Sequence, residues 1–117
     1  MNRSLADRTK EFALRVIRLY SSLPKNELAR VLGRQLLRSG TSVGAHCREA
    51  FRSRSNAELV SKLEVALQEL DETHYWFELL INSNIVSQRK LDALMMEANE
   101  LMAIIVSSVR TIKRRRH

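Results

Sequence analysis

The side chains best suited to acid–base or metal chemistry are two histidines that have carboxylates at helical spacing. His46 precedes Glu49 by three residues, and His74 follows Asp71 by three, so each pair would share one face of a helix. Di-metal centres in helix bundles, however, use two Glu-x-x-His motifs and two further glutamates, and neither pair has that form. We therefore predict no metal ion and no cofactor, and we expect both histidines in the core or at an interface.

The single cysteine, Cys47, is the other candidate for chemistry because it directly follows His46. Adjacent residues on a helix do not face each other, so the imidazole would not serve as a base for the thiol. The sequence also contains no phosphate-binding loop and no dinucleotide-binding motif. One cysteine excludes an intrachain disulfide and is typical of a reducing compartment. We predict an inert, buried thiol in a protein that is not an enzyme.

The net charge of +7 is unevenly distributed, which makes the basic residues the strongest functional candidates. Residues 1–54 carry +8, residues 55–109 carry −6 and residues 110–117 carry +5. Such segregation has two interpretations: the halves pair with each other, or a basic face meets an anionic partner such as nucleic acid. For the second interpretation, the predicted nucleic-acid-binding residues are Arg30, Arg34, Arg52, Arg54, Lys113, Arg114, Arg115 and Arg116.

The acidic residues between positions 55 and 82 offer a structural explanation for part of the basic charge. We expect Arg38 and Arg48 to pair with them, within or between subunits, although an exposed ion pair contributes only about 0–1 kcal/mol. Arg52, Arg54 and the basic tail are more peripheral, and there we expect free positive charge.

Four amphipathic segments must position these residues. Apolar side chains recur every three or four residues in each segment, and one proline and three glycines in the whole chain favour long helices over a sheet dense in turns. Short connections predict antiparallel neighbours. The predicted fold class is all-α: one domain over residues 1–117, an antiparallel up-down-up-down four-helix bundle with a frayed basic tail at 113–117. The predicted helices are Leu5–Ser22, Lys25–Phe51, Asn56–Asn82 and Gln88–Arg110.

Local signals set the helix boundaries and faces. Pro24 suits the first turn of the second helix, and Ser55 and Ser87 suit the N-caps of the third and fourth helices. The side chains expected on the inner side of the second helix are Leu28, Val31, Leu32, Leu36, Ser39, Val43 and Ala50.

The chain has no run of 18 apolar residues that could span a membrane, and no apolar leader segment between Met1 and Lys10. We therefore expect a cytoplasmic protein that makes no membrane contact.

Small and aromatic residues predict contacts between subunits. A glycine costs about 1 kcal/mol relative to alanine inside a helix, so Gly40 and Gly44, four residues apart, suggest a face that another helix approaches closely. The run Tyr75-Trp76-Phe77 cannot face one core entirely, because three consecutive residues sweep most of a helix turn. We expect Trp76 to leave the core, for a subunit interface or for a neighbouring helix of the same chain. The predicted interface residues are Arg38, Gly40, Gly44, Arg48 and Trp76.

Short motifs along most of the chain, from about Phe12 to Leu80, resemble one known family. They include Leu19-Tyr20, Leu23-Pro24, the run from Leu37 to Ala45, Arg48-Glu49-Ala50, Ser61-Lys62-Leu63, Asp71-Glu72-Thr73 and Tyr75-Trp76. The sequence is similar to the four-helix-bundle proteins encoded in intervening sequences of 23S ribosomal RNA genes. It departs from them at His46-Cys47, where the family usually has Asn-Ile.

The resemblance implies more than the residues do. The family is not known for catalysis, and it is related to the accessory variability protein of diversity-generating retroelements, a basic pentameric barrel that works with a reverse transcriptase and nucleic acid. A homo-oligomeric ring, a pentamer by resemblance, and RNA or DNA binding are thus implied. We predict a non-catalytic oligomer that binds nucleic acid through a basic surface. The alternative is a protein-interaction scaffold whose charges serve subunit contacts.

Overall fold

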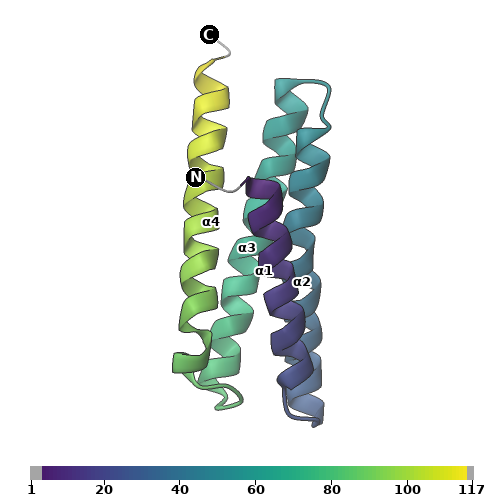
Figure 1. Ribbon diagram of the computed structural model, residues 1–117, viewed down its shortest axis with the longest axis vertical. Helices are drawn as coiled ribbons and strands as arrows, with labels where there is room; N and C mark the ends of the chain where they lie inside the picture. The colour runs from purple at the N-terminus through teal and green to yellow at the C-terminus, as the bar shows by residue number, and fades with distance from the viewer. Residues whose placement is uncertain (1–3, 116–117) are drawn as a thin grey trace.

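The computed structural model describes residues 4–115, and within that range its regular elements are all α-helices. Each helix lies beside the next one along the chain and runs antiparallel to it (Figure 1), which confirms the predicted up-down-up-down four-helix bundle. The bundle measures 51 × 24 × 22 Å along its principal axes. Its helices are α1 (Leu5–Ser22), α2 (Glu27–Phe51), α3 (Asn56–Asn82) and α4 (Gln88–Arg114).

A polar side chain caps the N-terminus of every helix. The predicted caps are confirmed: the Ser55 hydroxyl accepts a hydrogen bond from the Glu58 backbone N–H at 3.1 Å, and Ser87 caps α4 in the same way. The predicted start of α2 at Lys25 is wrong by two residues, because the Asn26 side chain is the cap and accepts from the Ala29 N–H at 3.0 Å. Pro24 therefore lies in the connection and not in the helix.

The last helix continues four residues beyond its predicted end at Arg110. Ile112 packs against the core, and the Lys113 ammonium lies 3.6 Å from a Glu64 carboxylate oxygen on α3. Because these contacts hold the last turn in place, Lys113 and Arg114 belong to α4 and not to the predicted frayed tail. His117 and Arg116 lie outside the described residues.

The buried stripe of α2 differs from the predicted one in a way that exposes large apolar side chains. Leu36, Val43 and Ala50 are buried as expected, but Leu28 is 53% exposed and Val31 is 46% exposed. Small residues take the inner positions in the first turns of this helix, because α1 packs so closely there that large side chains would not fit.

The glycines of α2 are the reason for that close approach. A Cβ atom at Gly40 would lie 2.9 Å from both γ-methyl carbons of Val16, and one at Gly44 would lie 3.2 Å from the Thr9 hydroxyl oxygen. The glycine stripe is thus the contact between α1 and α2 within one chain. The close approach that the sequence suggested for Gly40 and Gly44 is therefore made within the chain, and their place at a subunit interface stays a prediction.

We expect Gly40→Ala to destabilise the bundle despite the better helix propensity of alanine, which alone would stabilise by about 1 kcal/mol. Val16 is fully buried and β-branched, so it cannot rotate away, and overpacking of this kind costs about 1–3 kcal/mol. The urea midpoint should fall. Gly44→Ala is the control: its new methyl group has more room, and an equal loss of stability in both variants would contradict the packing explanation.

The helices differ in length, and one end of the bundle therefore lacks a fourth helix. Helix α1 has 18 residues, whereas α2, α3 and α4 have 25 to 27. It begins part-way along the bundle (Figure 1), so the last turns of α2 and α4 and the first turns of α3 project beyond it. We call this region, residues 48–59 and 107–115, the open end.

Candidate nucleic-acid interface

Part of the basic charge pairs with acidic residues of the same chain. The Arg38 guanidinium lies 3.4 Å from Glu69 and also contacts Glu72, both on α3. The Lys62 ammonium hydrogen-bonds Glu49 at 3.2 Å and lowers the pKa of that carboxyl group. Pairing between the two halves of the sequence, one of the two interpretations of the charge pattern, therefore occurs within the subunit at this face. The ion pairs of Arg38 with Glu69 and Glu72 also agree with the prediction that Arg38 pairs with acidic residues.

Both histidine side chains lie close to carboxylates on the helix surfaces. His46 lies 3.3 Å from Glu49 and 3.6 Å from Glu69, whereas His74 lies 3.4 Å from Glu78. His74 therefore pairs with Glu78, four residues later in the same helix, and not with Asp71. Within residues 4–115, no three His, Cys, Asp or Glu side chains come together as metal ligands.

Cys47 is fully buried, and burial raises the pKa of its thiol to about 11. A thiol with that pKa is almost entirely protonated at neutral pH, and the thiolate is the reactive form. The location of Cys47 agrees with the prediction of a buried, inert thiol.

The aromatic run in α3 has a different register from the expected one. Phe77 is fully buried, Trp76 is partly buried and packs against the core, and Tyr75 is 53% exposed. Successive helical residues are rotated by about 100°, so a residue two positions before Phe77 points away from the core. Tyr75, and not Trp76, is thus the aromatic residue that leaves the bundle.

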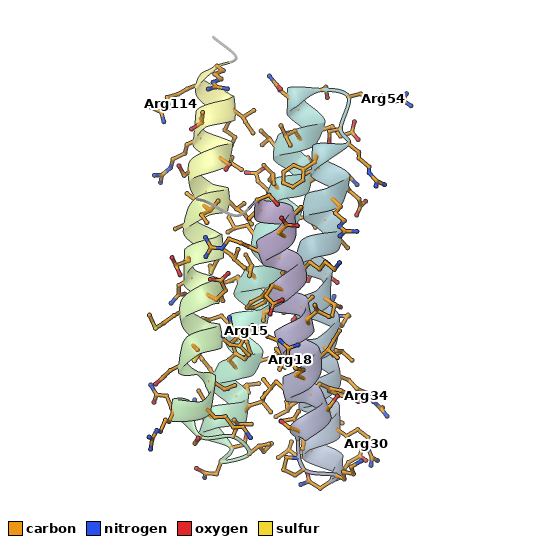
Figure 2. All side chains as sticks on the ribbon, viewed as in Figure 1. Arg15, Arg18, Arg30, Arg34, Arg54 and Arg114 are labelled. Carbon is orange, nitrogen blue, oxygen red and sulfur yellow. The ribbon has the colours of Figure 1, made fainter. Side chains whose placement is uncertain are left out.

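The predicted nucleic-acid-binding residues fall at two ends of the molecule. Arg30 and Arg34 lie in the first turns of α2, far from Arg54 and Arg114 at the open end (Figure 2). The rise of a helix places Arg30 and Arg52 about 33 Å apart along α2. The eight candidates therefore do not form one site, and Arg116 among them lies outside the described residues.

The open end collects six arginines that make no ion pair with any carboxylate within residues 4–115, in contrast to Lys113, which pairs with Glu64. Two of them were not among the predicted nucleic-acid contacts: Arg48 was assigned to an interface, and Arg110 was not singled out. The six are Arg48, Arg52, Arg54, Arg110, Arg114 and Arg115.

Two hollows lie at the open end, and Phe51 contributes to both. The first, of about 360 Å³, is lined mainly by apolar side chains of α2, α3 and α4, with Leu5 from the first turn of α1. The second, of about 320 Å³, follows the α2–α3 connection and includes Arg54 and Asn56. Phe51 is 51% exposed. The open end thus combines unpaired cationic groups with an accessible aromatic ring.

A further basic groove, not singled out from the sequence, lies between α1 and α4. Arg15, Arg18 and Lys90 line a hollow of about 370 Å³ that has no carboxylate in its lining, and Figure 2 shows the two arginines in this seam. Arg18 is 3.3 Å from Glu11. Arg15 and Lys90 are 75 positions apart in the sequence, so only the packing of the helices brings them together.

Fold and site together define a class: a basic four-helix bundle in which six arginines without an ion pair in residues 4–115 lie at the end that one short helix leaves uncovered. The chain belongs to the 23S rRNA-intervening sequence protein family, whose model matches residues 2–107. This confirms the family resemblance of the sequence motifs. No helix among the described residues is long and apolar enough to cross a membrane.

The fold also matches a solved structure. The chain is 36% identical to a protein of unknown function from the S23 ribosomal protein family of Bacteroides thetaiotaomicron, known from a crystal structure at 1.70 Å resolution. The similarity covers 91% of this chain and 98% of that one, with a TM-score of 0.85. No curated protein matches the sequence. Neither the family description nor that of the crystal structure names a reaction.

Proposed function

We propose that this protein is a non-catalytic homo-oligomer that binds RNA or DNA through its open end. The observation that carries the proposal is the group of six arginines at that end that have no carboxylate partner within residues 4–115. Phosphates are the chemical complement of such a group, because each guanidinium that neutralises a phosphate releases a condensed counterion. Arginine also binds phosphate with two parallel hydrogen bonds.

The experiment is a salt titration of oligonucleotide binding, followed by fluorescence anisotropy. Phosphate neutralisation makes log K fall linearly with log salt concentration, with a slope proportional to the number of contacts. A scaffold that uses its charges only between subunits would give no binding to titrate. That scaffold is the second candidate function. The exposed apolar side chains of Leu28 and Val31 favour it, whereas the ion pairs of Arg38, Lys62 and Lys113 lie within one chain.

Assembly is the second component of the proposal, and exposed aliphatic side chains support it. Leu28 and Val31 are three residues apart on α2, so they share a face, and about half of each side chain is exposed. A second subunit would remove this apolar surface from water. The resemblance to the accessory variability protein of diversity-generating retroelements implies five subunits in a ring, and a ring would repeat the basic open end and increase avidity.

We expect light scattering at low micromolar protein concentration and moderate salt to give an oligomer for the parent protein. The combined change Leu28→Gln and Val31→Gln should shift it towards monomer, because it makes the contact polar. Leu14→Gln with Ile17→Gln is the matched control, an exposed i, i+3 pair on α1. A monomeric parent protein would end the assembly proposal, and dissociation by the control alone would move the interface to α1.

A further inference from the structure

We propose that the open end binds single-stranded nucleic acid, with an unstacked base against the ring of Phe51. The inference rests on the proposed function and specifies the form of nucleic acid that the site takes. It starts from the position of Phe51, which is the last residue of α2, the helix end that extends past the start of α1 (Figure 1). With 51% of its surface exposed, it is the aromatic residue of the open end.

The surroundings of Phe51 have the composition of a site for a base. Its ring and Leu59 are shared by both hollows, so a flat aromatic ligand could lie against the phenyl ring with apolar contacts from α3 and α4. Stacking of bases on aromatic side chains is the general means by which proteins hold single strands without regard to sequence. In a duplex the bases are paired and stacked, and they would not reach a hollow of this kind.

Polar groups in the hollows suit the edge of a base. The Ser108 hydroxyl donates to the Ile104 carbonyl at 2.8 Å, and the Thr111 hydroxyl donates to the Ser107 carbonyl at 3.0 Å. Because their hydrogens are already engaged, the two oxygens are left as acceptors for the N–H groups of a base.

The charges around Phe51 complement the backbone of the same strand. Arg52 is the next residue in the chain, and Arg54 lines the second hollow beside the ring. Neither makes an ion pair within residues 4–115. A strand that places one base against Phe51 therefore meets guanidinium groups with its adjoining phosphates. Cationic groups that follow the backbone, combined with an aromatic platform for the bases, characterise single-strand binding surfaces.

The test compares three labelled oligonucleotides of equal length by anisotropy: a mixed-sequence single strand, the duplex it forms with its complement, and an abasic strand with the same phosphates. The parent protein should bind the single strand about tenfold more tightly than the abasic strand, the effect expected of one stacked base. Phe51→Leu keeps an apolar side chain but removes the ring. It should lose that tenfold preference and leave binding of the abasic strand unchanged.

Two further variants make the result specific. Phe51→Tyr keeps the ring and should retain the preference, so a folding defect in Phe51→Leu cannot imitate the expected pattern. Tyr75→Leu removes an aromatic ring of similar exposure on α3 and should have no effect. Equal binding of the single strand by Phe51→Leu and the parent protein, with a normal salt slope, would overturn the inference and leave the proposed function standing. Absence of binding to any oligonucleotide would overturn both.

Discussion

Removal of Arg52 and Arg54 together, each replaced by alanine, is expected to weaken oligonucleotide binding about tenfold at moderate salt. Both side chains are at the open end, and neither has a carboxylate partner within residues 4–115, so their charge is available to phosphates. The salt slope should fall by about 1.4, since each contact with a single strand contributes about 0.7. The loss should be the same for different sequences, because phosphate contacts carry no sequence information.

The matched control for this pair is Arg30→Ala with Arg34→Ala. It removes the same two charges from the same helix, and these residues also make no ion pair within residues 4–115, but they lie at the other end of the bundle (Figure 2). If binding follows net charge alone, the two double variants will behave alike. A larger loss for the control than for Arg52 and Arg54 would place the interface at the first turns of α2 and contradict the proposal.

Phe77→Ala is expected to have the largest effect on stability, with a loss of about 3–5 kcal/mol in the free energy of unfolding. The ring is fully buried and belongs to the hydrophobic core, so its removal loses apolar burial and leaves a cavity that the surrounding helices fill only in part. Native domains are stable by only about 5–15 kcal/mol. The variant should therefore unfold at a much lower urea concentration, as measured by circular dichroism.

Tyr75→Ala is the control two positions away, and it tests the register of α3 directly. About half of this side chain is exposed, so the change should cost less than about 0.5 kcal/mol. Trp76→Ala should give an intermediate loss, because the indole packs against the edge of the core. A greater loss for Tyr75→Ala than for Phe77→Ala would show that the helix is rotated relative to the described one.

The helices themselves could be predicted from the sequence because their signals are local. The apolar repeat identified four amphipathic segments, and short polar caps fixed the starts of α3 and α4 at Ser55 and Ser87. The two boundary errors have local causes as well. Helix α2 begins later than predicted because the Asn26 side chain caps its N-terminus. Helix α4 ends later than predicted because its apolar repeat continues through Ile112.

Which face of each helix is buried was decided by packing between helices. The glycines of α2 bring α1 within van der Waals contact, so the inner positions go to small residues, and Leu28 and Val31 turn outwards. A hydrophobic pattern within one helix contains no information about how closely its neighbour approaches. The rotation of α3 that exposes Tyr75 and retains Trp76 depends on its neighbours in the same way.

The candidate site shows the same division between sequence and tertiary structure. The sequence alone determined that the protein is basic and that arginine supplies most of its positive charge. It could not determine which basic residues are free, because Arg38 and Lys113 find their partners in other helices. Nor could it show that α1 stops short of one end, so that Arg54 and Arg114, 60 residues apart in the chain, lie at the same end of the bundle (Figure 2). Ion pairs and helix ends depend on distances between segments, and only the folded bundle sets those distances.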